Sequence, residues 1–183
     1  MKNRILSVCV PVAVAAAAWT GISLLPVLLR AQAPPPPDAP EVVDYQKLLP
    51  LFPEAPSGWT AEKPEGQTAE ALTNVHRDYK KGEGDNVPIT SISIIDSVAN
   101  PESITVTTAA WKTNSETSDG YTKSVTIDGN PGSESYEKDQ KHAALRLLVA
   151  KRYFLAIELQ NQDPKELQEW VKRVDLKKLA EIK

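Results

Sequence analysis

Residues 143–159 read AALRLLVAKRYFLAIEL and consist of two runs of alternating side chains on either side of a charged turn. Adjacent side chains of a strand point to opposite faces of a sheet, so an apolar residue at every second position predicts a strand with one buried face. Lys151 and Arg152 separate the two runs, which predicts a tight turn. The apolar positions are Leu145, Leu147 and Val149 in the first run and Tyr153, Leu155, Ile157 and Leu159 in the second.

Two more strands are predicted immediately before this hairpin, at Tyr121–Ile127 and Ser133–Lys138. Residues 128–132 between them are Asp-Gly-Asn-Pro-Gly, and Asp-Gly is a strong signal for a hairpin turn. With strands at Ala143–Ala150 and Tyr153–Leu159, the segment 121–159 is predicted to form a four-stranded antiparallel meander.

A separate hairpin is predicted from Val75–Lys80 and Val87–Val98, joined by a loop of glycine, aspartate and asparagine at residues 81–86. In its second strand, apolar or β-branched residues at positions 90, 92 and 94 alternate with serines, so one face is expected to be buried.

A helix is predicted to begin at Asn100-Pro101-Glu102, which combines a capping side chain, a proline at the first helical position and an acid in the first turn. Ile104 and Trp111 are seven residues apart and would form its buried stripe.

A C-terminal helix is predicted after Asp163-Pro164-Lys165-Glu166, which has the pattern of a capping box. Its apolar stripe is Leu167, Trp170, Val171 and Val174. The order of elements predicts an α+β fold, an antiparallel sheet of about six strands packed with two or three helices.

The N-terminal residues 1–33 are predicted to be a signal peptide or signal anchor. Lys2 and Arg4 precede an uncharged, mostly apolar stretch from Ile5 to Leu29, which is the pattern of an export leader. Positive charge before the stretch predicts that the N-terminus stays in the cytoplasm and the rest is exported. The protein is therefore expected in the periplasm or at the cell surface, either secreted or anchored.

Two alternatives stand for the fate of the leader. Ala31-Gln32-Ala33 has the small residues of a signal peptidase site, but Pro34 follows and fits poorly in an extended backbone. The apolar stretch also reaches the roughly 20 residues that span a bilayer. If the leader is retained, residues 5–29 are expected to be the only membrane contact.

The exported part is predicted to be one domain behind a spacer. Nine prolines lie between residues 34 and 64, so residues 34–56 are assigned as a Pro-rich spacer and 57–183 as a single α+β domain. Without residues 1–33 the chain has 18 basic and 24 acidic side chains, a net charge of −6 that disfavours nucleic acid as a partner. The single cysteine, Cys9, lies in the leader, so no disulfide is expected after it.

No catalytic motif is complete. His76-Arg77-Asp78 matches the start of the kinase catalytic loop, but Glu83 stands where a metal-binding asparagine is required. Ser135–Lys138 fits Ser-x-x-Lys, a pattern that chance alone explains in this composition. His142 is the only other histidine, and residues 83–86 lack the spacing of a calcium loop. No catalytic residue, metal site or cofactor is therefore assigned.

The one candidate ligand-binding residue is Trp59, because it follows Ser57-Gly58 in a predicted loop. Trp111 and Trp170 lie on helix stripes and are expected in the core.

Two stretches carry a family resemblance. Residues 56–66, beginning Pro-Ser-Gly-Trp, and the segment from Gly120 through residues 127–132 to the Trp170 helix and Leu179 resemble uncharacterised bacterial exported proteins with a PsbP-like α/β/α sandwich. Members of that family are mostly non-enzymatic extracytoplasmic accessory or lipoprotein-type domains, and this chain lacks the lipoprotein cysteine. The resemblance implies a non-catalytic envelope domain that binds a protein or small ligand. The alternative is a small extracytoplasmic hydrolase that uses dispersed carboxylates.

Overall fold

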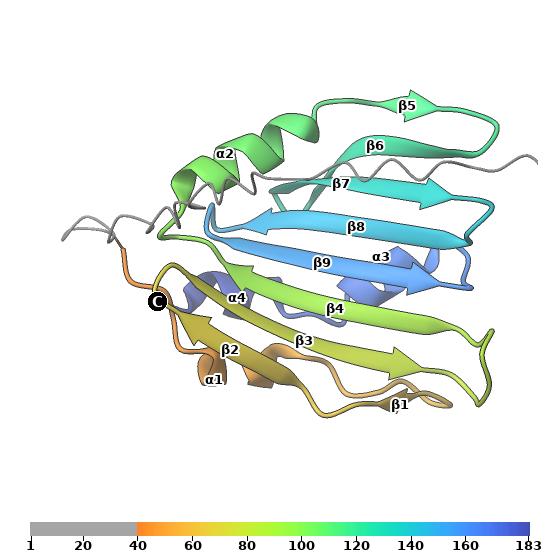
Figure 1. Ribbon diagram of the computed structural model, residues 1–183, viewed down its shortest axis with the longest axis horizontal. Helices are drawn as coiled ribbons and strands as arrows, with labels where there is room; N and C mark the ends of the chain where they lie inside the picture. Colours follow the sequence, from red (N-terminus) through yellow and green to blue (C-terminus); the bar gives the residue numbers. More distant parts are fainter. Residues whose placement is uncertain (1–39) are drawn as a thin grey trace, which may run out of the picture. The chain divides into compact units, whose positions relative to one another are not determined.

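The computed structural model describes residues 40–183, which are built around one nine-stranded sheet (Figure 1). The strands follow the order β1-β3-β4-β9-β8-β7-β6-β5, with β2 also paired to β3, and every pair is antiparallel. The fold is therefore α+β with an open antiparallel sheet, as predicted, but with more strands than the six expected.

The strands are β1 (Thr60–Ala61), β2 (Glu65–Ala69), β3 (Leu72–Lys80), β4 (Ile89–Asp96), β5 (Ser115–Glu116), β6 (Gly120–Ile127), β7 (Asn130–Glu137), β8 (His142–Val149) and β9 (Tyr153–Gln160). The helices are α1 (Tyr45–Leu48), followed by the 3₁₀ turn η1 (Leu49–Leu51), α2 (Pro101–Ala110), α3 (Glu166–Val171) and α4 (Leu176–Glu181).

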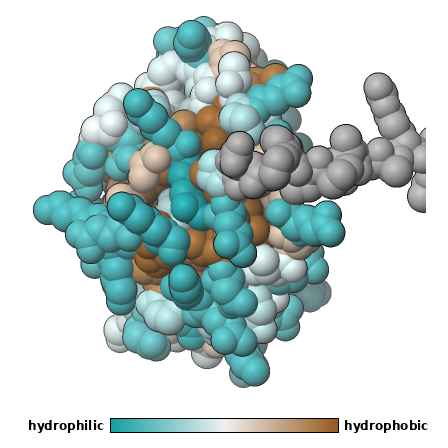
Figure 2. All heavy atoms as spheres, turned by 90° about the vertical axis from the view of Figure 1, so that its left-hand side faces the viewer, coloured by the Kyte–Doolittle hydropathy of each residue, from teal (hydrophilic) through white to brown (hydrophobic). Residues whose placement is uncertain are grey.

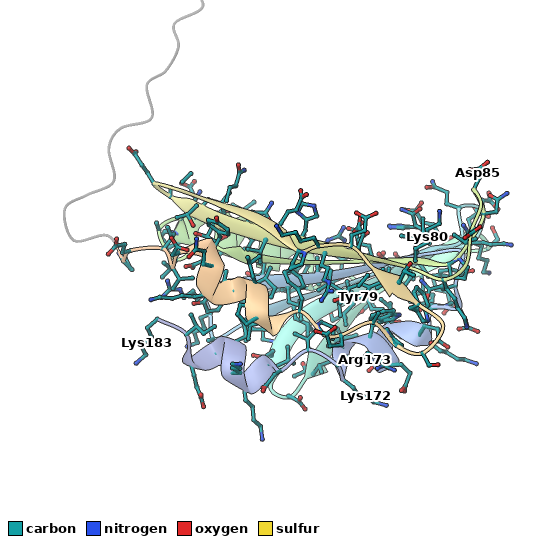
Figure 3. The ribbon with its side chains drawn as sticks, turned by 90° about the horizontal axis from the view of Figure 1, so that it is seen from below. Tyr79, Lys80, Asp85, Lys172, Arg173 and Lys183 are labelled. Atoms are coloured by element: carbon teal, nitrogen blue, oxygen red, sulfur yellow. The ribbon has the colours of Figure 1, made fainter. Side chains whose placement is uncertain are left out.

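The period-two pattern gives the sheet one buried face, which we call the inner face. Ile92 of β4, Ile157 of β9 and Leu145 of β8 are register partners across three neighbouring strands, and each is at most 1% exposed. Helices α1, α3 and α4 cover this face, and Tyr79 points into the space between it and the helix layer (Figure 3). The predicted apolar stripe at residues 167, 170, 171 and 174 is buried here, as expected.

Among the helices of residues 40–183, α2 alone lies on the opposite, outer face. Trp111, which ends α2, lies edge-on against Phe154 of β9 with ring centroids 5.8 Å apart. Phe154 alternates with the inner-face residues of β9, so α2 packs on the other side of the sheet from α3 and α4. The predicted cap is confirmed, because the Asn100 side chain accepts a hydrogen bond from the Ser103 N–H.

Two hairpin turns differ in position from the sequence-based expectation. The β6–β7 turn consists only of Asp128 and Gly129, both with positive φ, and β7 begins at Asn130 rather than Ser133. The β8–β9 turn has positive φ at Ala150 and Lys151, one residue earlier than expected. Positive φ at both central residues is the type I′ geometry, which matches the twist of the flanking strands.

Three strands and two helices, α1 and α4, were not predicted. β1, β2 and β5 are short and polar, and they exist as edge strands because β3 and β6 offer them unpaired backbone. The single predicted C-terminal helix is two short helices, because the Asp175 side chain caps a new one at Lys178 N–H.

The core begins earlier than residue 57. Segment 43–52 was assigned to the proline-rich spacer, yet Val43, Leu48, Leu51 and Phe52 are at most 6% exposed and belong to the main hydrophobic cluster. Within residues 40–183 no helix is long and apolar enough to cross a bilayer. The expected leader at residues 1–33 lies outside the described residues.

Different segments of the chain lie at the two ends of the sheet. Residues 41–43 and the C-terminal Lys183 lie at one end, which we call the entry end, and Asp85 in the β3–β4 turn lies at the other (Figures 1 and 3). Figure 2 looks onto the entry end and shows apolar side chains in a band between polar ones.

Two buried tyrosines on the inner face are expected to make the stability of the fold pH-dependent in the alkaline range. The Tyr79 hydroxyl donates to the Pro53 carbonyl at 2.8 Å and the Tyr153 hydroxyl to the Ile182 carbonyl at 2.9 Å. Burial raises the pKa of both phenols to about 12. Because the phenol pKa is higher in the folded state, the folded state favours the neutral phenol. This contribution to the free energy of unfolding is complete below pH 10, the pKa in the unfolded chain, and is lost as the pH rises towards 12.

We expect each of these phenols to reduce the free energy of unfolding by about 1 kcal/mol at pH 11 relative to pH 9. Urea denaturation at both pH values measures the loss, and it should shrink in Tyr79→Phe and Tyr153→Phe, whose rings do not ionise. A phenolate absorbance titration in which all five tyrosines ionise together near pH 10 would contradict the expectation.

Candidate functional site

Trp59, the residue predicted to bind a ligand, lies at the rim of the core. Its ring is half-buried and meets Trp170 edge-on at a centroid distance of 5.1 Å, and Trp170 in turn lies 4.9 Å from the Tyr79 ring. Trp111 and Trp170 are buried, as expected. The role of Trp59 in ligand contact stays a prediction.

The two histidines lie apart on the outer face. His76 on β3 and His142 on β8 are separated by β4 and β9, so three strand spacings, about 14 Å, lie between their strands. His142 is 3.7 Å from the Glu158 carboxylate. Among residues 40–183 no group of three or more metal-binding side chains comes together, including at the loop 83–86.

The Ser-x-x-Lys pattern does not form a catalytic pair. Ser135 lies on the outer-face side of β7, opposite Ala144 of β8. The Lys138 ammonium donates instead to the Ser118 backbone carbonyl at 2.7 Å. The Lys138 side chain therefore links the end of β7 to the loop between β5 and β6 by a hydrogen bond.

A hollow of about 730 Å³ opens between strands β5, β6 and β7 and the start of α3. We call it the Glu134 pocket, because Glu134 is its buried acidic group. The side chains that matter for its chemistry are Glu116 of β5, Tyr121 and Lys123 of β6, Glu134 of β7, and Lys165 and Gln168 at α3.

Glu134 is only 5% exposed, which is rare for a carboxylate and requires compensating partners. Its Oε1 accepts a hydrogen bond from the Tyr121 hydroxyl at 2.7 Å and from the Lys123 ammonium at 2.8 Å. Among residues 40–183, the only hydrogen-bond partner of its Oε2 is the Gln168 amide at 3.5 Å, at the outer limit of a hydrogen bond. One oxygen is therefore well satisfied and the other poorly satisfied.

Tyr121 is held as a neutral donor. Burial raises its phenol pKa, and the hydrogen bond to Glu134 raises it further because ionisation would place two negative charges in contact. The Lys123 ammonium lies 4.9 Å from the centroid of the Tyr121 ring, within cation–π range. On the neighbouring strand β7, the Tyr136 ring lies 6.0 Å from that of Tyr121.

Sequence reasoning missed these residues because it made the β6–β7 turn three residues too long, at 128–132 instead of 128–129. With Asp128 and Gly129 as the only turn residues, positions equally far from them face each other. Lys123 is five residues before Asp128, and Glu134 is five after Gly129, so the two are register partners. A strict two-residue Asp-Gly hairpin would have paired these charges from sequence alone.

Comparison of the chain with family models, with curated proteins and with solved structures finds no match.

Proposed function

We propose that this protein is a non-catalytic extracytoplasmic domain that binds a small ligand in the Glu134 pocket. The observation that carries the proposal is the poorly satisfied Oε2 of a carboxylate that is 5% exposed at the wall of a 730 Å³ hollow. Small-molecule sites are typically hollows of about this size with a few polar groups at fixed positions. Tyr121 and Lys123 fix the carboxylate and leave Oε2 for a donor from a ligand.

The position of the pocket suits a domain tethered at its N-terminus. Residues 41–43 lie beside Arg152 at the entry end of the sheet. Lys165, which lines the pocket, comes shortly after β9 ends at the opposite end of the sheet. An export leader that is retained as an anchor would join the domain at its entry end, which is not the end of the sheet that Lys165 follows. The proposal therefore combines the leader at residues 1–33 with a binding site at the far end of the sheet.

The layer arrangement supports the proposed likeness to PsbP-like α/β/α sandwiches. α2 lies on one face of the sheet and α1, α3 and α4 lie on the other (Figure 1). That likeness favours an accessory or binding role over catalysis.

Screening a library of small polar and amphipathic molecules by ligand-observed NMR tests the proposal. We expect at least one ligand whose Kd weakens about tenfold or more in Glu134→Gln, because a charge-assisted hydrogen bond contributes about 1.5–3 kcal/mol. His76→Ala, on the outer face, is the matched control and should bind like the unchanged protein. Ligands that bind both variants equally, or no ligand at all, would overturn the proposal.

A hydrolase remains the second candidate, since Glu116 and Glu134 line the same hollow. Such an enzyme would turn over a substrate in a hydrolase panel and lose activity in both Glu116→Gln and Glu134→Gln. Glu134 does not resemble a free general base, because Tyr121 and Lys123 already donate to its Oε1.

A further inference from the structure

The Glu134 pocket already contains an alkylammonium group, that of Lys123. Its Nζ contacts the carboxylate at 2.8 Å and lies over the Tyr121 ring at 4.9 Å. A carboxylate combined with an aromatic face is the set of groups that recognises ammonium ions. The Lys123 side chain is 48% exposed, so it reaches the site from the solvent side and can leave it without opening the core.

The charge of the pocket favours a cation once Lys123 is set aside. Glu116 and Glu134 then contribute two negative charges to the lining and Lys165 one positive charge, so the remaining charge is negative. An anionic ligand would meet the buried Glu134 carboxylate without a counterion, which is costly. A ligand ammonium would restore the ion pair and could also donate to Oε2.

We propose that the Glu134 pocket recognises an alkylammonium group on a small ligand, and that Lys123 occupies the ammonium position in the free protein. The inference rests on the proposed function and specifies the ligand chemistry of that site. Ligand binding then consists of an exchange, in which the incoming ammonium displaces the Lys123 ammonium from Glu134 and the Tyr121 ring. The ligand body lies in the rest of the hollow.

The exchange makes Lys123 a competitor of the ligand, and this distinguishes it from a purely structural ion pair. Lys123→Met keeps the length of the aliphatic stem but removes the ammonium, so the ligand no longer has to displace a tethered group. Loss of an internal competitor raises affinity, whereas loss of a structural ion pair has no reason to raise it.

The test is titration by NMR of the full protein with three probes of matched length: hexylammonium, hexanol and hexanoate. We expect Lys123→Met to bind hexylammonium about tenfold or more tightly than the unchanged protein, without a comparable gain for hexanol or hexanoate. Glu134→Gln combined with Lys123→Met should lose the gain. Lys165→Met removes a neighbouring ammonium that has no contact with Glu134 and should change affinity less than about threefold.

A second measurement covers the case in which Lys123→Met folds poorly. In the unchanged protein, hexylammonium should shift the NMR signals of the Lys123 side chain towards those of a solvated lysine, and hexanol should not. Equal gains for all three probes, or no displacement of Lys123, would overturn the ammonium proposal. If a library ligand still depended on Glu134, the proposed function would stand while the ammonium assignment failed.

Discussion

Replacing Asp96 by asparagine is expected to reduce the free energy of unfolding by about 3–5 kcal/mol, because it removes the fully buried carboxylate that pairs with the Arg152 guanidinium, whose side chain is only 16% exposed. A domain of this size is stable by about 5–15 kcal/mol, so the loss is a large share of the total. The inner-face end of β4 therefore carries one of the most sensitive side chains of the fold.

The geometry explains the size of this effect. Asp96 is fully buried, and its two oxygens accept hydrogen bonds from Arg152 Nε at 2.9 Å and from an Arg152 terminal nitrogen at 2.7 Å. Its Oδ2 also accepts from the Val43 N–H at 2.8 Å, and Arg152 donates to the Glu41 carbonyl. An asparagine has only one acceptor oxygen, so its NH₂ group would face one of these donors. The Asp96 carboxylate also raises the pKa of Arg152, which keeps the guanidinium charged.

Urea denaturation of the purified protein measures the loss, and Glu158→Gln is the matched control. Glu158 pairs with Arg146 at 3.3 Å, but both side chains are at least 40% exposed, so this change should cost less than about 1 kcal/mol. Hydrogen exchange at the Val43 amide should accelerate only in Asp96→Asn. Equal effects of the two substitutions would contradict the assignment of Asp96 as the link between residues 41–43 and the sheet.

The elements predicted correctly from sequence are those in which burial follows a local period. In β9 every second residue from Tyr153 is buried, and the α3 stripe repeats with helical spacing, so the sequence of each element carries its own signal. β2, with the sequence Glu-Gly-Gln-Thr-Ala, has no such signal. It is a strand because β3 pairs with it, and a partner distant in sequence is invisible to a local pattern.

The candidate site was missed for a related reason. Trp59 was predicted to bind a ligand because it follows a glycine in a predicted loop. Its aromatic neighbour is Trp170 at the rim of the core, and it does not line the Glu134 pocket. The pocket depends on the register of one hairpin and on the position of Lys165 and Gln168 against it. The register follows from a two-residue turn, whereas the packing of α3 on β8 and β9, which brings Gln168 to Glu134, does not follow from any local sequence pattern.

Trp170→Ala is expected to reduce the free energy of unfolding by about 3–5 kcal/mol, because it leaves a cavity between α3 and the inner face. Trp170 is 3% exposed and is enclosed by the rings of Trp59 and Tyr79. Trp170→Phe keeps an aromatic ring there and should cost less than the alanine substitution. Urea denaturation followed by circular dichroism measures both changes without relying on tryptophan fluorescence.

A double-mutant cycle then decides what Trp59 does. If its edge-on contact with Trp170 is structural, Trp59→Ala and Trp170→Ala should show a coupling energy of about 0.5–1.5 kcal/mol. Trp111→Ala is the matched control, since Trp111 packs on the outer face against Phe154 and its effect should add to that of Trp170→Ala. An uncoupled Trp59 whose removal leaves stability unchanged but weakens a ligand would instead support its predicted role in binding. Stability and ligand affinity measured on the same variants therefore separate a core contact from a binding residue.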